Sequence, residues 1–417
     1  MTAPGLRTAA PVDDPDSPRR PGLRFADLVA PVTPDEFFDR YWETEALHTT
    51  GPRRSDFAGI VGLHQLDHLL AQLSGTGKVR LARMDGSQHT ATVDAGAHAL
   101  PALYRSFSAG STIIVDGLHT FWPPVRDLCR TLLAELGMQV QANLYVTPRA
   151  AKGFGCHWDG HDALILQIEG QKLWTVYDSA DLLPHPASSG AAYDTGTAPG
   201  RDITLRAGDV LYIPRGMPHR AATGAEASVH LTVGLVAATW QDLLIAGIEE
   251  LVTRAPGLRA SLPRGWWRTG GPDDAWRARY REFVGELGDS GVLAPGLARL
   301  ASQLVESAPT VPDGHFGSLD LAAGIDLDTV VTRRPGSIVR TARSGAEARL
   351  VFPGSFVAGP VKLFWAFDFV ARTETFAVRD IPGWYSDDER VVVTRALVRA
   401  GFLGIVPRAR NEMGEGG

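Results

Sequence analysis

The chain has 417 residues, of which 44% are hydrophobic and 21% charged, and its formal net charge is -6. This length allows two or three domains with a large buried core. The mild acidity argues against the basic surface that nucleic-acid-binding proteins usually carry, so we expect no direct nucleic-acid binding.

The two cysteines, Cys129 and Cys156, are too few for a disulfide framework or an all-cysteine zinc site. No apolar run approaches the length that spans a bilayer, and we expect no contact with a membrane. Residues 1–24 combine Pro, Asp and Arg without an apolar core, which indicates a disordered tail and not a signal peptide. We therefore expect a cytoplasmic protein.

Helical patterns dominate the first ordered part of the chain. Thr33 can cap a helix whose first position is Pro34. Apolar residues then recur at helical spacing in residues 63–73 and again in residues 125–136. We expect three helices here, with Cys129 on the apolar face of the third.

From residue 141 to residue 236 the apolar residues no longer recur at helical spacing and instead tend to alternate with polar ones. "QANLYVT" alternates apolar and polar residues, and "ALILQI", "KLWTVY", "GDVLYIP" and "SVHLTVGL" are short strand-like runs separated by turn residues. Many short strands divided by Gly, Pro and Asp turns predict an antiparallel sandwich or barrel, here a jelly roll. We expect residues 25–240 to form this domain.

Two further parts follow the predicted jelly roll. Residues 241–312 return to helical patterns and end near the Pro/Gly-rich stretch "APTVPDGHFGS", which looks like a boundary. Residues 313–410 mix strands such as "ARLVFPGSFV" with a helix in "SDDERVVVTRALVRAGFL", which suits a small α+β module.

The stretch "GFGCHWDGHDALILQIEGQKLWTVY" contains the first candidate metal ligands. If the segment is extended, His157 and Asp159 point to the same side, although such a triplet alone is as easily a surface loop. His219 ends a rigid loop, "PRGMPH", and in a jelly roll it can return beside this pair. Two histidines and one carboxylate are typical of non-haem Fe(II) oxygenases, which keep positions open for a co-substrate and dioxygen.

Lys172 lies near the start of a predicted strand that also carries Trp174 and Val176 on the same face. One interpretation is a solvated strand lysine. The other is a fixed cation for a dicarboxylate co-substrate, a role that suits a compact ammonium on a flexible stem. The second is favoured because the chain otherwise prefers arginine and has only four lysines.

Other polar residues give weaker signals. His161 and Asp162 could support the metal ligands from outside, or they could be ordinary loop polarity, and both interpretations stay open. His64 and His68 are four residues apart but lack the glutamate of a zinc-protease motif, so we expect a solvated helix face.

Several linked motifs resemble one known family. They are "FFDRYWE", "ANLYVTP", "HWD", "LQIEGQKLWTVY", "LYIPRGMPH" and "ASLPRGWW", which together span most of residues 25–270. In this order they are similar to the JmjC-type, cupin-like 2-oxoglutarate oxygenases that include the ribosomal oxygenases. The resemblance implies a mainly β catalytic core folded as a double-stranded β-helix (jelly roll, cupin/JmjC). It also implies a helical dimerisation segment and a C-terminal winged-helix-like α+β module.

The resemblance also implies roles for individual residues. His157, Asp159 and His219 would be the catalytic Fe(II) ligands, and Lys172 would hold the distal carboxylate of 2-oxoglutarate. The other residues expected to line the co-substrate pocket are Asn143, Tyr145 and Thr232, with His230 beside Thr232. The chain departs from the family at Trp158, where Phe or Tyr is usual, and at Gly160, where a polar residue is common. Both departures bear on substrate identity more than on the chemistry.

The implied activity is hydroxylation of a protein side chain, with Fe(II), 2-oxoglutarate and dioxygen as cofactor and co-substrates. A ribosomal protein is one candidate substrate, and the enzyme is expected to be a homodimer. Three alternatives stay open: an oxygenase acting on a natural-product peptide or small molecule, a JmjC-type demethylase, and a cupin-like metal-binding protein without turnover.

Overall fold

The computed structural model describes residues 23–407 except 52–56, 58, 74, 85–87, 93–98, 179–182, 186–197, 269–270, 289 and 336–337. The tail predicted as disordered, residues 1–24, therefore lies almost wholly outside the described residues. Within the described part of the chain, none of the helices combines the length and the apolar character that crossing a bilayer requires.

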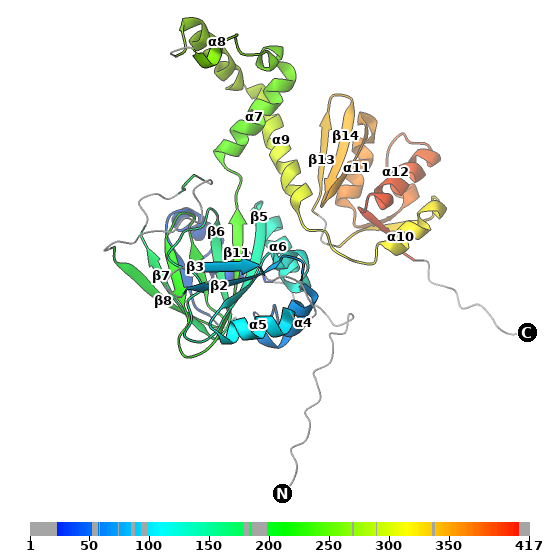
Figure 1. Cartoon of the computed structure of the whole chain (residues 1–417). Helices are drawn as coiled ribbons and strands as arrows, with labels where there is room; N and C mark the ends of the chain where they lie inside the picture. The colour runs from blue at the N-terminus through cyan, green and yellow to red at the C-terminus, as the bar shows by residue number, and fades with distance from the viewer. Residues whose placement is uncertain are drawn as a thin grey trace, which may run out of the picture.

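Helices precede and flank the first sheet (Figure 1). Thr33 caps α2 by accepting a hydrogen bond from the Glu36 backbone N–H, and Pro34 occupies the first position, as predicted. The apolar faces of α4 and α6 are buried against the sheet, and Cys129 lies within that core. The helices of this part are α1 (Phe25–Val29), α2 (Pro34–Arg40), α4 (Leu63–Leu73), α5 (Ala99–Ser108) and α6 (Pro123–Leu136).

Two antiparallel sheets form the body of this part of the chain. Among the described residues, one sheet has eight strands in the order β1-β9-β6-β11-β5-β4-β2-β3 and the other has three in the order β10-β7-β8. This arrangement agrees with the predicted jelly-roll core. The strands are β1 (Leu47–Thr49), β2 (Val79–Met84), β3 (Gln88–Thr92), β4 (Thr112–Val115), β5 (Gln139–Thr147), β6 (Asp162–Glu169), β7 (Gln171–Tyr177), β8 (Gly200–Arg206), β9 (Val210–Ile213), β10 (His219–Ala222) and β11 (Ser228–Val236).

The alternation of side chains divides each strand of the large sheet between two environments. One face packs against the helices, where Leu144 and Leu231 are fully buried. The opposite face looks toward the small sheet, where an apolar cluster includes Ile165 and Trp174. The polar residues of β5 and β11 also alternate away from the helix-facing core, because successive side chains of a strand point to opposite faces.

A tight turn connects the two sheets between β6 and β7. Gly170 has φ +65°, and a Cβ built there would lie 2.0 Å from the carbonyl oxygen of Ala227. Only glycine fits such a left-handed conformation with the backbone this close. The turn carries the chain from β6 into β7, where Lys172 is the second residue.

Three helices follow the jelly roll and extend away from it in Figure 1. They are α7 (Trp240–Arg254), α8 (Asp274–Leu287) and α9 (Ser290–Ser307), joined through the short 3-10 helices η3 (Pro256–Arg259) and η4 (Trp266–Arg268). Thr239 and Asp242 form a reciprocal capping box at the start of α7. Trp240 remains 81% exposed, so this segment presents more apolar surface than a linker requires.

The C-terminal part has its own hydrophobic core. Its strands form two three-stranded antiparallel sheets, β16-β12-β17 and β13-β14-β15. The α+β composition agrees with the prediction, whereas a winged-helix topology stays a prediction. The elements are α10 (Phe316–Leu321), η5 (Ala322–Gly324), β12 (Val330–Arg333), β13 (Arg340–Ser344), β14 (Glu347–Phe352), β15 (Ser355–Pro360), η6 (Val361–Leu363), α11 (Phe364–Arg372), β16 (Thr375–Ala377), η7 (Val378–Asp380), α12 (Asp387–Arg399) and β17 (Leu403–Ile405).

Candidate metal centre

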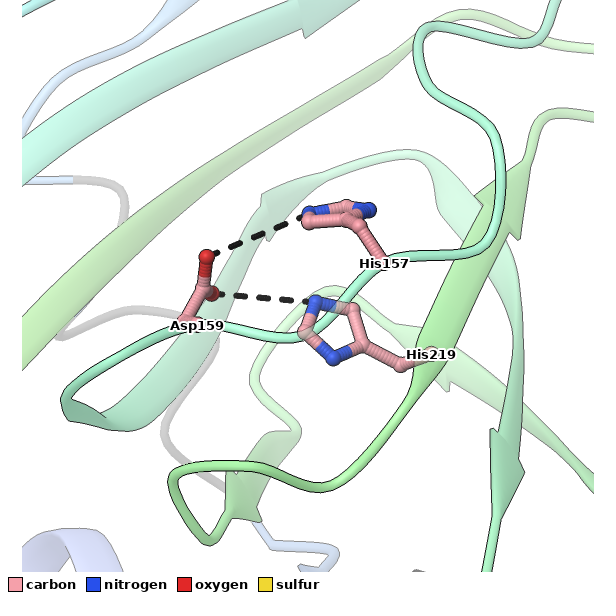
Figure 2. A group of neighbouring side chains, drawn as sticks. All are labelled: His157, Asp159 and His219. Atoms are coloured by element: carbon pink, nitrogen blue, oxygen red, sulfur yellow. Dashed lines mark ion pairs between the residues drawn. The ribbon is translucent and has the colours of Figure 1, made fainter. Parts of the chain in front are cut away.

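Two histidines and one aspartate of the jelly roll point toward a common centre (Figure 2). The potential ligand atoms of His157, Asp159 and His219 all lie within 4.8 Å of one another. Nε2 of His157 is 4.0 Å from Oδ1 of Asp159, and Nε2 of His219 is 3.7 Å from Oδ2 of the same carboxylate. These separations leave room for one ion between the three side chains.

Backbone pairing brings the two histidines together although they are far apart in the sequence. The N–H of His157 donates to the carbonyl of His219 at 3.1 Å, and the N–H of His219 donates to the carbonyl of His157 at 2.8 Å. Asp159 follows two residues later, and its carbonyl accepts from the Gly216 N–H at 3.0 Å. The ligand geometry is therefore built on main-chain hydrogen bonds and not on the side chains alone.

The orientation of both imidazole rings favours metal binding through Nε2. Nδ1 of His157 lies 2.9 Å from the carbonyl oxygen of Gly155, and Nδ1 of His219 lies 3.0 Å from that of Met217. A carbonyl oxygen can only accept, so Nδ1 is the donor in each contact and Nε2 is the nitrogen left to face a metal. Burial also lowers the pKa of His219, which keeps this ring neutral and able to act as a ligand.

The donor set fits a divalent transition metal. Two neutral imidazoles and one carboxylate on the same side of a site, with the remaining positions open, are the arrangement of non-haem iron centres. The Asp159 side chain is 32% exposed, so the centre is accessible from outside the barrel. A search of the described residues for three or more neighbouring His, Cys, Asp or Glu side chains that could hold an ion finds this cluster.

Lys172 lies deep in the barrel and is only 5% exposed, so the interpretation as a solvated strand lysine is wrong. Its Nζ donates to Oγ1 of Thr147 at 2.9 Å, and no carboxylate among the described residues forms an ion pair with it. Burial lowers the pKa of Lys172 to about 7, because a buried ammonium loses its hydration. A carboxylate entering this pocket would supply the missing countercharge.

An aromatic wall connects the surroundings of Lys172 with the metal cluster. Tyr145 stacks on His230 with ring centroids 4.8 Å apart and an interplanar angle of 6°. The Trp174 ring lies edge-on to His230 at 5.5 Å and tilted against His219 at 5.8 Å. Nδ1 of His230 and Nε1 of Trp174 are buried without a hydrogen-bond partner among the described residues, which leaves polar atoms for a ligand to satisfy.

The remaining predicted pocket residues lie on the same two strands. Thr232 pairs with Asn143, and His230 pairs with Tyr145, in the antiparallel ladder of β11 and β5. Thr232 is buried, whereas the side-chain oxygen of Asn143 already accepts from the Gly117 N–H at 2.8 Å. Asn143 therefore also holds the turn that precedes α6.

Three further residues line the surroundings of Lys172 or the metal cluster and were not predicted from the sequence. Thr147 is the next polar position after Tyr145 in the alternation of "QANLYVT", which could have revealed it. Trp174 lies two residues after Lys172 on the same strand face, so the spacing that places Lys172 in the pocket also indicates Trp174. Phe154 lies between two glycines and places its ring 5.6 Å from His157 and 6.4 Å from Tyr145, which no sequence pattern indicates.

Other polar residues remain outside the cluster. Asp162 is fully buried and accepts from the Tyr212 hydroxyl at 2.5 Å, and Nδ1 of His161 lies 3.2 Å from the Asp162 carbonyl. His64 and His68 are exposed on α4, as predicted. Trp158 is half-buried and Gly160 is exposed, and both are next to Asp159 in the chain.

Comparison with known proteins places this centre within a recognised domain. Residues 120–243, which contain all three cluster residues and Lys172, match the family model described as the JmjC domain. The chain contains a JmjC domain. The predicted resemblance to the JmjC-type, cupin-like family is thereby confirmed.

Two curated relatives each match more than half of this chain. The chain is 30% identical over 252 residues to the bifunctional lysine-specific demethylase and histidyl-hydroxylase NO66 of Drosophila grimshawi. This alignment covers 58% of this chain and 35% of that protein. It is 31% identical over 263 residues to ribosomal oxygenase 1 of Rattus norvegicus. This second alignment covers 60% of this chain and 44% of that protein. The chain therefore spans less than half the length of these relatives.

A solved structure extends the similarity beyond the JmjC domain. YcfD, a ribosomal oxygenase from Escherichia coli in complex with cobalt and 2-oxoglutarate, aligns over 89% of this chain and 98% of its own, with a TM-score of 0.56 and 18% identity. At this identity the likeness concerns the fold. It includes the helical and C-terminal parts as well as the jelly roll, because it covers most of the chain.

Proposed function

We propose that this protein is an Fe(II)- and 2-oxoglutarate-dependent oxygenase that hydroxylates a protein side chain. The convergence of His157, Asp159 and His219 on one point carries the proposal. It is supported by the JmjC domain around these residues and by relatives that are named hydroxylases and oxygenases. The proposed cofactor and co-substrates are Fe(II), 2-oxoglutarate and dioxygen.

In this proposal the three cluster residues bind the metal through two Nε2 atoms and one carboxylate. The main-chain pairing of His157 with His219 fixes their separation, and the Nδ1 contacts fix the ring planes. Bound iron with its co-substrates would supply the oxidising chemistry that no side chain can perform. The protein then has to orient the groups and exclude water.

The co-substrate pocket lies on the Lys172 side of the centre. The Lys172 ammonium is the proposed partner of the distal carboxylate of 2-oxoglutarate, with the Thr147 hydroxyl beside it. Tyr145, Asn143 and Thr232 are the proposed polar lining. The stacked rings of Tyr145 and His230 would keep the pocket narrow and dry, which strengthens the ion pair.

The proposed substrate is a side chain of a ribosomal protein, since two of the similar proteins are named ribosomal oxygenases. Lysine demethylation is the second candidate, because the name of the NO66 relatives includes it and the same metal chemistry serves both reactions. Trp158 and Gly160 flank Asp159 in the chain and are at least partly exposed, so in this proposal they shape the wall that the substrate meets. A natural-product peptide or small molecule is the third candidate.

The parts outside the JmjC domain have proposed roles of their own. Residues 25–240 are the proposed catalytic domain, residues 241–312 the dimerisation segment of a homodimer, and residues 313–410 a winged-helix-like module. The exposed apolar side chains of α7 and α9 support the second assignment. A cytoplasmic location completes the proposal.

Conversion of 2-oxoglutarate to succinate by the purified protein with Fe(II) tests the reaction class. Intact-mass comparison of ribosomal proteins from cells with and without the gene then tests the substrate. Hydroxylation requires one protein to lose the mass of one oxygen atom on deletion, whereas demethylation requires a gain of methyl groups. No succinate under any substrate condition would contradict the proposed reaction and favour a metal-binding protein without turnover.

A further inference from the structure

Four side chains form a second polar cluster beside the metal centre, which we call the rim network. It consists of Glu43, Asp162, Tyr212 and Arg215. The Tyr212 hydroxyl accepts from the Glu43 backbone N–H at 2.8 Å and donates to Oδ1 of Asp162 at 2.5 Å. Nη2 of Arg215 donates to Oε1 of Glu43 at 2.5 Å, and its Nη1 lies 3.8 Å from Oδ2 of Asp162. The network is thus a closed ring of contacts.

The rim network is largely shielded from water. The side chains of Asp162 and Tyr212 are fully buried, and that of Arg215 is mostly buried. Buried charged groups are retained only where they are paired and hydrogen-bonded. Because a surface loop would not require this arrangement, the interpretation of Asp162 as ordinary loop polarity is wrong.

The rim network contacts both segments that carry the proposed metal ligands. Asp162 follows Asp159 by three residues at the start of β6, and Arg215 precedes His219 in the loop between β9 and β10. The Arg215 N–H lies 3.4 Å from Oδ1 of Asp162, and the next N–H, that of Gly216, donates to the Asp159 carbonyl at 3.0 Å. A shift of this loop would therefore move both ligands.

We propose that the rim network positions Asp159 and His219 for metal binding. The inference rests on the proposed function, in which these two residues bind Fe(II). Hydrogen bonds outside the ligand set orient the ligands, and losing one typically costs about 10- to 100-fold in metal affinity. None of the four residues belongs to the candidate ligand cluster, so in this proposal they act as positioning residues.

Glu43 extends this support beyond the JmjC domain. It precedes the residues that match the family model, 120–243, and follows α2 in the N-terminal part of the chain. Its φ of +58° is uncommon for a residue other than glycine. In this conformation its N–H reaches Tyr212 while its carboxylate reaches Arg215. The N-terminal segment thereby stabilises the loop that carries His219.

Tyr212→Phe is the sharpest test, because it removes one hydroxyl and leaves the ring packed edge-on against Phe37. Co(II) serves as the probe, since its affinity and its visible spectrum both report ligand geometry. We expect Co(II) affinity to fall about 10- to 100-fold and the spectrum to change, while the near-ultraviolet circular dichroism of the metal-free protein stays the same. The matched control is Tyr385→Phe, which removes a hydroxyl that donates to the Lys362 carbonyl in the C-terminal part and should leave Co(II) binding unchanged.

Arg215→Lys is the second variant. It keeps a positive charge but loses the planar fork that reaches Glu43 and Asp162 at once. We expect it to weaken Co(II) binding in the same range. Wild-type Co(II) affinity and spectrum in both variants would overturn the inference while leaving the proposed function intact. A wild-type protein that binds no Co(II) would contradict the proposed function itself.

Discussion

The Lys172 ammonium donates to the hydroxyl of Thr147 at 2.9 Å in the interior of the jelly roll, and this hydroxyl is an uncharged partner. Thr147 Oγ1 in turn accepts from Oγ1 of Thr112 at 3.2 Å. A threonine hydroxyl orients an ammonium but does not neutralise it. The pocket thus holds a cation whose countercharge is absent from the described residues, and this underlies the first two predictions.

Replacing Lys172 should weaken co-substrate binding specifically. A hydrogen bond to a charged group is worth about 1.5–3 kcal/mol, which corresponds to roughly 10- to 150-fold in affinity. We expect Lys172→Ala to raise the 2-oxoglutarate concentration needed for half-maximal succinate formation by that factor. Metal affinity should be unchanged, because Lys172 is not in the ligand cluster. An unaltered 2-oxoglutarate requirement would assign the distal carboxylate to another residue.

Co-substrate binding should depend on pH in a defined direction. Burial lowers the pKa of Lys172 from its ordinary 10.5 to about 7, so the ammonium is present below this value and is lost as the pH rises through it. Burial also lowers the pKa of the adjacent His230 and raises that of Tyr145, so both stay neutral over the same range. We expect 2-oxoglutarate affinity to be highest below about pH 7 and to fall by up to about tenfold per pH unit above it.

Titration calorimetry with 2-oxoglutarate at several pH values and a fixed Mn(II) concentration checks this dependence. Lys172→Arg provides the control, because a guanidinium stays protonated throughout and should flatten the profile. A wild-type affinity that does not change with pH would show that Lys172 is charged over the whole range.

Removing one ligand should abolish stabilisation by metal without unfolding the protein. The His157 side chain is partly exposed, and its Nδ1 contact is to a backbone carbonyl, so His157→Ala should keep the thermal midpoint of the metal-free protein close to that of wild type. Metal at 100 times its dissociation constant stabilises a protein by about 2.7 kcal/mol, which raises the wild-type midpoint by several degrees. The variant should lose this rise. His161→Ala is the matched control, and a loss of equal size there would contradict the assigned ligand set.

Sequence patterns predicted those features that depend on short-range periodicity. The helix expected over residues 63–73 is α4, since apolar spacing marks its buried face. The polar face of β5 was predicted from its alternation, and the register places Tyr145 against His230 on β11. The sequence allowed two interpretations of Lys172, a solvated side chain or a buried cation without a carboxylate partner. Alternation on a strand separates the two faces but does not show which face is exposed to solvent.

Long-range contacts account for what the sequence analysis missed. Arg215 and Glu43 are 172 positions apart, and no local pattern links them. Their contact depends on how β9 and the turn after α2 pack together, which is a property of the folded chain. The same holds for Phe154, whose position over His157 follows from a loop and not from a strand or helix.

The helical segment gives the last prediction, which concerns assembly. Trp240, Leu244 and Ile248 follow one another at four-residue spacing on α7, so they share one face, and all three are exposed. Exposed apolar surface of this kind usually marks an interface, and a second copy of the chain is the proposed partner. Leu244→Glu with Ile248→Glu should therefore shift the protein from dimer to monomer in sedimentation velocity at micromolar concentration. Trp384→Glu is the control, because Trp384 is fully exposed in the C-terminal part and lies outside the proposed dimerisation segment. A wild-type protein that sediments as a monomer would contradict the proposed homodimer, and a double variant that remains dimeric would place the interface on another surface.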